Sequence, residues 1–251
     1  VVVQNKNSQF FGGTSTVAAK ATRVRARIVA QTINEQMQNS DKVFIMGHDN
    51  EDYDAIGSAI GMAKLSLSLN KETYIVLSGR NDNVTRISEM LARESIKVND
   101  HEEDYNSIMV EEAEALKHIT PNSLLILVDH HREILTASKS VLEAIPKRII
   151  VDHHRRSEDL LADTVLLYLE PSSSSTSELL TELVGYFNDR LEFTPAEATA
   201  LYSGIVLDTK NFAVQTGERT FEAAALLRRN GADSNMVRLM FKDDMDVLKL
   251  R

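Results

Sequence analysis

Short apolar runs alternate with amphipathic stretches through most of the chain, beginning at Lys42. Each run holds four to six residues, mostly valine, isoleucine and leucine, which suits a buried strand and is too short for a core helix. The stretches between the runs space their apolar residues as helices do. Such alternation is typical of a mostly parallel sheet flanked by helices, so we predict an α/β fold. The predicted strands are residues 42–46, 73–77, 124–128, 148–151 and 164–169.

Two helix starts are indicated by capping patterns. Thr194 and Glu197 stand three positions apart with Pro195 between them, the pattern of a capping box with proline at the first helical position. Ser175 and Glu178 repeat the spacing ahead of another apolar stretch. We therefore predict helices that begin at these two places.

A third helix is predicted for residues 54–69, with Asp54 at or near its N-terminus. Small residues recur through its first half, and they favour a helix that lies close on a sheet, although each glycine costs up to about 1 kcal/mol against alanine. The small residues are Ala55, Gly57, Ala59 and Gly61.

The first 40 residues differ from the rest of the chain. Residues 1–15 hold a short β-like piece that ends in two glycines, and a helical pattern follows from Val17. We interpret residues 1–40 as the tail of a preceding domain and a linker helix. Arg23, Arg25 and Arg27 are expected on a solvated face of this helix, with a nucleic acid or lipid contact as the alternative.

Composition narrows the class of protein. The 251 residues, 43% of them hydrophobic, suffice for one large domain or two small ones. The sequence contains no cysteine, which fits a reducing compartment and restricts metal ligands to oxygen and imidazole. Its apolar runs are too short to cross a bilayer. The net charge of −9 opposes binding to duplex nucleic acid and suits a small anionic substrate held through cations.

Acidic and histidine residues recur where predicted elements end. The carboxyl ends of parallel strands meet at one edge of a sheet, where ligands bind, so we expect these residues to converge. Two copies of a VDHH sequence, 23 positions apart, indicate two strands that end at this edge. A carboxylate and imidazole set of this density predicts two divalent metals and a phosphoryl hydrolase. The set comprises His48, Asp52, Asp54, Asp129, Asp152, His153, His154 and Asp208.

In combination these motifs resemble the DHH phosphoesterase superfamily over roughly residues 42–245. The resemblance rests on HxxxDxD after the first strand, an aspartate after a second strand, the triplet Asp152-His153-His154, and SGIVLDTKNF at 203–212. Within the superfamily the chain looks most like the catalytic part of the membrane-anchored bacterial cyclic-di-AMP phosphodiesterases of the GdpP type. MGHxxxDxDAIG, EPSSSSTSELLTELV and the upstream FFGG and TRVRARIVA carry this closer similarity.

The resemblance implies a role for each site residue. It implies two manganese ions, the first held by His48 and Asp52, the second by Asp54, His153 and Asp208, with Asp129 bridging both. His154 is implied as a phosphate contact or a proton donor to the leaving oxygen. Asp152 would orient its neighbours, and we expect Arg155 to contact the substrate.

Two departures from the family pattern stand out. Relatives usually follow the bridging aspartate with Thr or Asn and then His, whereas this chain has His130 and His131, which we expect to be supporting or exposed imidazoles. The family also normally continues into a second, smaller domain with a glycine-rich, His-containing loop that grips the substrate. We expect that domain to lie outside this chain, with residues 41–245 as the DHH phosphoesterase domain and 246–251 as the start of a linker.

Two further features keep two interpretations each. The serine run at 172–175 fits either a phosphate-touching loop or a flexible connection with a helix cap. The ring of Phe212, shortly after Asp208, fits either stacking on a base or an ordinary place in the core.

The expected function is hydrolysis of cyclic-di-AMP to linear pApA by metal-activated water. The expected location is the cytoplasmic face of the membrane, with the anchor in upstream segments of a full-length protein and this portion soluble. A homodimer is left open. Two alternatives remain: another DHH-type hydrolase, namely an oligoribonuclease, exonuclease or pyrophosphatase, and a non-catalytic metal-binding regulatory module.

Overall fold

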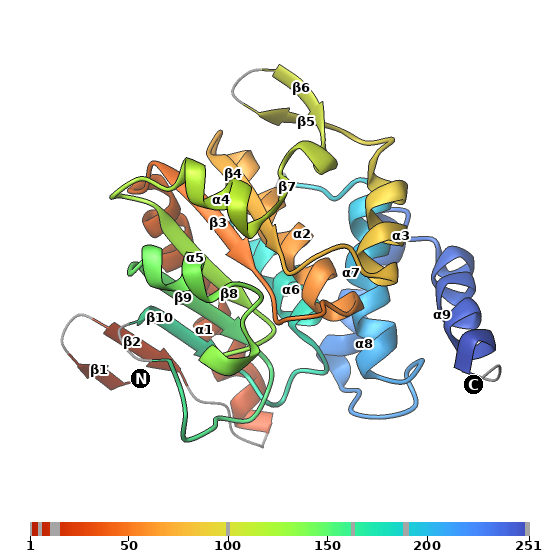
Figure 1. Cartoon of the computed structure of the whole chain (residues 1–251). Coiled ribbons are helices and arrows are strands. Elements are labelled where there is room, and N and C mark those ends of the chain that lie inside the picture. The colour runs from red at the N-terminus through yellow and green to blue at the C-terminus, as the bar shows by residue number, and fades with distance from the viewer. Residues whose placement is uncertain are drawn as a thin grey trace.

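A computed structural model describes residues 2–4, 7–10, 16–98, 101–161, 164–187 and 191–248. Within these ranges, eight strands form one sheet in the order β1-β2-β10-β9-β8-β3-β4-β7 (Figure 1). The strands of the sheet are β1 (Val2–Gln4), β2 (Asn7–Phe10), β3 (Lys42–Met46), β4 (Glu72–Leu77), β7 (Met109–Glu111), β8 (Leu124–Val128), β9 (Arg148–Asp152) and β10 (Thr164–Leu169). A separate antiparallel hairpin consists of β5 (Ser95–Val98) and β6 (His101–Asp104).

Helices connect the strands and cover the sheet. They are α1 (Thr16–Gln38), α2 (Tyr53–Ser68), α3 (Asp82–Leu91), α4 (Glu112–His118), α5 (Lys139–Ala144), α6 (Thr176–Phe187), α7 (Pro195–Asp208), α8 (Glu218–Arg229) and α9 (Ser234–Leu248). Two short 3-10 turns are η1 (Tyr105–Ser107) and η2 (Glu133–Leu135). No helix in the described ranges has a stretch long and apolar enough to span a membrane.

The predicted α/β fold is confirmed. All five predicted strands are present as β3, β4, β8, β9 and β10, and each pairs in parallel with its neighbours. Only the β1–β2 pairing in this sheet is antiparallel among the described strands. Strand β7 and the β5–β6 hairpin were not predicted from the sequence. These strands have only three or four residues, at least one of them charged, so no apolar run marks them.

Alternate residues of the strands bury on opposite faces of the sheet, as the two-residue period of a strand requires. One face packs under α1, α2, α6 and α7 and contributes Val43, Ile45, Ile126 and Val151 to the larger core. The opposite face packs under α4 and α5 with Phe44, Met46, Leu127 and Ile150. Burial on both faces explains why these strands are continuous apolar runs rather than alternating ones.

The order of the strands places a crevice between β3 and β8. After β3 the chain moves outward to β4 and β7, and it then returns to the other side of β3 to build β8, β9 and β10. In sheets of this kind, ligands bind at the carboxyl ends of strands where the order reverses. His48 follows β3 and Asp129 follows β8, so both lie at this switch point.

Helix α2 makes its closest approach to α7. The sequence suggested that its small residues serve contact with the sheet, but a Cβ atom on Gly57 would lie 2.5 Å from the Ala200 carbonyl oxygen of α7. A Cβ atom on Gly61 would lie 2.9 Å from Leu201 Cδ2. The glycines therefore let two helices touch, which fixes where α7 ends beside the crevice.

Helix α1 packs into the same core through Val29, Ile33 and Met37. Its arginines differ from one another. Arg23 and Arg27 are exposed, as expected of a solvated face, although Arg23 pairs with a glutamate of α8. The half-buried Arg25 departs from that expectation, because it pairs with a buried carboxylate. The glycines that end the first β-like piece lie outside the described residues, as do residues 249–251.

Candidate metal centre

Three residues from the β3 and β8 ends form the first group of ligand atoms. His48 Nε2 lies 3.6 Å from Asp52 Oδ1 and 3.6 Å from Asp129 Oδ2. The other ring nitrogen, Nδ1, lies 2.9 Å from the Asp49 carbonyl oxygen. A hydrogen bond from Nδ1–H to that carbonyl leaves the lone pair on Nε2, the form that binds a metal.

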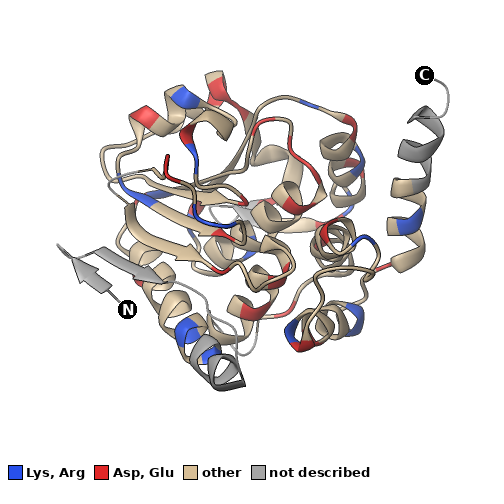
Figure 2. Cartoon of the chain, turned by 90° about the horizontal axis from the view of Figure 1, so that it is seen from below, with Lys and Arg blue, Asp and Glu red and all other residues tan. Residues whose placement is uncertain are grey.

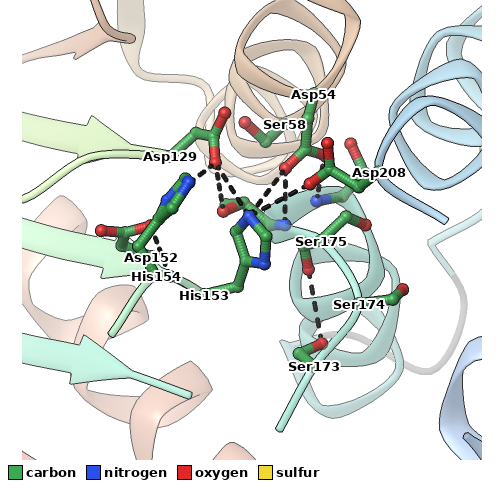
Figure 3. A network of polar contacts seen from close by, with 12 residues as sticks. Asp54, Ser58, Asp129, Asp152, His153, His154, Ser173, Ser174, Ser175 and Asp208 are labelled. Atoms are coloured by element: carbon green, nitrogen blue, oxygen red, sulfur yellow. Dashed lines mark hydrogen bonds and ion pairs between the residues drawn. The ribbon is translucent and has the colours of Figure 1, made fainter. Parts of the chain in front are cut away.

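The second group lies around His153, directly after β9. His153 Nε2 lies 3.1 Å from Asp208 Oδ2 and 4.0 Å from Asp54 Oδ2. Figure 3 shows the contacts converging on this ring nitrogen. The nitrogen is buried and, among the described residues, has no hydrogen-bond partner of suitable direction. A buried imidazole nitrogen surrounded by carboxylates, without a hydrogen bond, fits a metal ligand.

Asp129 belongs to the first group and also lies beside His153 of the second. Its Oδ2 lies 3.6 Å from His48 Nε2, and its Oδ1 lies 3.5 Å from His153 Nε2. In each group the three ligand atoms lie within 4.8 Å of one another, and ligand atoms of Asp129, His153 and His154 form a third set of this kind. The backbone of Asp129 is left-handed, with φ of 63°, which aspartate adopts at less cost than most residues. One carboxylate thus presents one oxygen to each group.

Two aspartates after β3 form hydrogen bonds that fix the start of α2. Asp52 caps α2 by accepting hydrogen bonds from the backbone amides of Asp54 and Ala55 through Oδ1. Asp54 then lies in the first turn, fully buried. Its two oxygens accept hydrogen bonds from the backbone amides of Thr176 and Ser177, at 2.7 and 2.8 Å. These amides begin α6, and the N-terminus of a helix stabilises an anion.

A glycine of α7 makes room for this arrangement. A Cβ atom on Gly204 would lie 2.6 Å from Asp54 Oδ1 and 2.3 Å from Ser177 Oγ, closer than atoms can approach. Sequence reasoning identified neither Gly204 nor the α6 amides as part of the site. The apolar SGIV motif contains the glycine, but only the contact between segments explains why it is needed.

The electrostatics of the two groups favour bound cations. Burial and the charge of Asp208 raise the pKa of Asp54 to about 6. Burial and the charge of Asp54 raise the pKa of Asp129 well above its usual value. Burial alone would lower the pKa of His153, but the neighbouring Asp208, Asp54 and Asp129 raise it to about 10. The carboxylates thus compete for positive charge, which protons supply when no metal is bound.

Asp152 links His154 and His131 through its two carboxylate oxygens. Its Oδ1 accepts a hydrogen bond from His154 Nδ1 at 2.8 Å and another from the His154 backbone amide. Its Oδ2 contacts His131 Nδ1 at 2.5 Å. Burial would raise the pKa of Asp152, but these histidines hold it well below its usual range. A hydrogen bond from His154 Nδ1 fixes the orientation of that ring.

The two uncertain histidines are both buried rather than exposed. His131 Nε2 lies 2.9 Å from Ser157 Oγ, so this ring joins Asp152 to the next loop. His130 Nδ1 lies 3.1 Å from the Val128 carbonyl oxygen, and burial lowers the pKa of this imidazole to about 4. A supporting place for both residues agrees with the first of the two expected interpretations.

Ser173, Ser174 and Ser175 are a buried support for α6 while Ser172 is exposed, so the serine run matches neither of its two interpretations fully. Ser175 caps the helix by accepting from the Glu178 amide. The Glu178 carboxylate does not complete the predicted capping box with Ser175. It accepts instead from Ser173, Ser174 and Thr220 of α8. The buried Glu178 carboxylate therefore holds the loop in place. The other predicted capping box, of Thr194 and Glu197, is complete.

A pocket of about 920 Å³ opens over both groups. His154 and Arg155 lie on its wall, and both side chains are exposed. Arg132 also lies there, but its Nε donates a hydrogen bond to Asp159 Oδ2 at 2.7 Å. Figure 2 shows basic and acidic residues interspersed along the described elements. This distribution fits a small substrate better than a long nucleic acid.

Comparison with known proteins gives a family for this arrangement. The model of the "DHH family, N-terminal domain" matches residues 42–205, which contain β3 to most of α7 and every predicted ligand except Asp208. The chain belongs to the DHH family.

Members of the DHH family with curated names are similar over nearly the whole chain. The "Cyclic-di-AMP phosphodiesterase PdeA" of Listeria monocytogenes is 39% identical over 243 residues, 97% of this chain and 36% of that protein. The "Cyclic-di-AMP phosphodiesterase GdpP" of Bacillus subtilis is 37% identical over 246 residues, 98% of this chain and 36% of that protein. The chain thus spans about a third of the length of these relatives.

A solved structure supports the fold. An exopolyphosphatase-related protein from Bacteroides fragilis superposes with a TM-score of 0.64 at 21% identity, over 86% of this chain and 60% of that one. At this identity, the likeness concerns the fold alone. The six predicted ligands are brought together by the structure, and their assignment to metals stays a prediction.

Proposed function

We propose that the chain holds two Mn²⁺ ions and hydrolyses cyclic-di-AMP to the linear dinucleotide pApA. The observation that carries this proposal is the position of Asp129, whose two oxygens face His48 and His153 from one carboxylate. A carboxylate shared in this way is the ligand that two-metal hydrolases place between their ions. The substrate comes from the similarity to the two phosphodiesterases.

The ligand set suits two divalent cations. His48, Asp52 and Asp129 would hold the first, and Asp54, His153 and Asp208 the second, with Asp129 shared through its oxygen beside His153. The four carboxylates carry four negative charges when ionised, which two divalent cations balance. Carboxylate and imidazole donors suit manganese, and the chain has no thiolate that would select softer metals. Bound cations would supply the charge that activates water and stabilises the transferring phosphoryl group.

The chain's own groups have clear tasks around the phosphodiester. Asp152 would hold the His154 ring so that Nε2 contacts a phosphate oxygen or donates a proton to the leaving oxygen. Arg155, exposed on the pocket wall, would pair with a second phosphate oxygen. The buried α6 amides keep the Asp54 carboxylate in place throughout.

We further propose that residues 41–245 are the hydrolase domain of a longer protein. In the relatives, the corresponding segment is about a third of the chain, so their remaining length has room for a membrane anchor and a substrate-gripping domain. In this proposal the domain works at the cytoplasmic face of the membrane, and a second copy of the chain is a candidate partner.

The experiment is hydrolysis of cyclic-di-AMP by the chain with added Mn²⁺, with products separated by chromatography and His153→Ala as control. We expect pApA from the parent and none from the variant. Pyrophosphate and short oligoribonucleotides are assayed in parallel. Faster turnover of either would replace the proposed substrate, and two bound metals without turnover of any of them would favour a regulatory module.

A further inference from the structure

A second pocket, of about 700 Å³, lies beside the metal centre. The two pockets share Asp52, so a molecule whose phosphate lies at the first metal group can extend directly into the second pocket. Its walls come from the start of α2, Asn83 of α3, the end of α7 with the turn that follows it, and the first half of α9. Tyr202, Val206 and Leu207 give it an apolar side.

The other side of this pocket carries unused polar groups. Asn211 and Asn235 lie there with Lys210 and Arg238. Within the described part of the chain, none of these four side chains forms a hydrogen bond or an ion pair, and all four are exposed. An asparagine amide offers a donor and an acceptor next to each other, the pattern that pairs with the edge of an adenine base. The positively charged side chains of Lys210 and Arg238 suit the adjoining phosphates.

The backbone beside the pocket is strained. Lys210, Asn211 and Phe212 have successive φ values of 47°, 59° and 64°, one residue after Asp208. Thr209 holds this left-handed turn, because its Oγ1 accepts from the Phe212 amide and its carbonyl oxygen accepts from the Ala213 amide. Non-glycine residues in this region are held against a local cost, and such strain clusters at functional sites. The turn presents Asn211 at the pocket and links it to a metal ligand.

We propose that this pocket binds one purine base of the dinucleotide whose phosphate lies at the metal centre. The inference rests on the proposed function, since it assigns the base of that same substrate. A base is flat, with two apolar faces and a polar edge. The apolar side of the pocket would take a face and the asparagine side the edge, so the pocket selects nucleotide phosphodiesters over other phosphate esters.

Titration calorimetry with two probes tests the inference on the Mn²⁺-loaded chain. The probes are 5′-AMP and ribose 5-phosphate, which share the sugar phosphate and differ in the base. We expect the parent to bind 5′-AMP at least about tenfold more tightly. The double variant Asn211→Gly with Asn235→Ala should reduce this preference to about twofold or less. Glycine is chosen because it tolerates the left-handed backbone of residue 211.

The matched control is Asn70→Gly, another exposed asparagine with positive φ, at the far end of α2 from the metal centre. It should keep the full preference for 5′-AMP. Equal binding of the two probes by the parent, or an unchanged preference in the double variant, would overturn the inference. Neither probe is a phosphodiester, so these results are independent of the assay of cyclic-di-AMP turnover. If the parent prefers 5′-AMP but does not hydrolyse cyclic-di-AMP, the base-binding inference stands and the proposed function is wrong.

Discussion

Gly204 and Asp54 lie so close that no side chain fits between them. A Cβ atom on Gly204 would lie 2.6 Å from Asp54 Oδ1, which is held by the α6 amides and cannot retreat without losing a hydrogen bond. The position of the proposed ligand Asp54 therefore depends on the absence of a side chain at residue 204 of α7.

Gly204→Ala should weaken the metal centre and the fold together. The added methyl pushes α7 away from α2 and displaces Asp54, so we expect a loss of about 1–3 kcal/mol in the free energy of unfolding and at least one Mn²⁺ fewer per chain. Denaturant unfolding and metal analysis measure the two effects. The control is Gly185→Ala in α6, where a Cβ atom meets nothing within 4 Å and the change should stabilise by about 0.5–1 kcal/mol. Full metal content in Gly204→Ala would contradict the packing argument.

Asp152→Asn should slow turnover while leaving the metals in place. The amide keeps the shape of the buried side chain but removes the charge that holds His154 and His131. We expect kcat for cyclic-di-AMP to fall by about 10–100-fold with unchanged Mn²⁺ content. Asp159→Asn, an exposed carboxylate on the next loop, is the matched control and should keep at least half of the activity. Loss of metal in Asp152→Asn would place Asp152 among the ligands instead.

The metal-free chain should lose stability as the pH rises above neutrality. His48 and His153 have pKa values raised from the usual 6.5 to about 11 and about 10. Groups whose pKa is raised on folding stabilise fully below pH 6.5, and that contribution is lost as the pH rises through the folded values. With EDTA, Tm should therefore fall between pH 7 and pH 9.5.

Added Mn²⁺ should make this fall smaller, because the cations replace the protons on the two histidines. Calorimetry in buffers of different ionisation enthalpy should record about two protons released at pH 7.5 when the centre fills. A Tm in EDTA that rises between pH 7 and pH 9.5, or metal binding without proton release, would show that these imidazoles are neutral in the metal-free protein.

Arg25→Ala should destabilise the protein more than Arg23→Ala. Arg25 Nη1 lies 3.1 Å from Glu170 Oε2, and the Glu170 side chain is fully buried. Removal of the Arg25 side chain therefore leaves the buried Glu170 carboxylate without its cation. We expect a cost of about 1–3 kcal/mol. Arg23 pairs with Glu222 where both side chains are about half exposed, and such pairs contribute under about 1 kcal/mol. Equal unfolding free energies for the two variants would show that α1 does not support the loop after β10.

Much of the fold could be predicted because its signals are local. A strand buried on both faces is an apolar run, and a ligand at the end of a strand follows that run directly, as His48, Asp129 and His153 do. The capping box at Thr194 was visible for the same reason. These features need only a few neighbouring residues to be recognised.

The remaining features depend on contacts between distant segments. Asp54 accepts from an amide 123 positions away, and Arg25 reaches a carboxylate 145 positions away. The Glu178 carboxylate accepts from Thr220 of α8, although a local capping pattern offered it a nearer partner. No periodicity encodes such contacts, so the role of Gly204 and the burial of Ser173, Ser174 and Ser175 required the structure.

The bridging role of Asp129 is tested most directly by counting the Mn²⁺ ions bound per chain in the parent and in Asp129→Asn. Asparagine keeps the size of the side chain and tolerates the φ of 63°, so the fold should persist. We predict about two tightly bound ions in the parent, loss of tight binding of both in Asp129→Asn, and about two in the control Asp49→Asn, a pocket carboxylate outside both groups. Two tightly bound ions in folded Asp129→Asn would contradict the two-metal centre built on this residue.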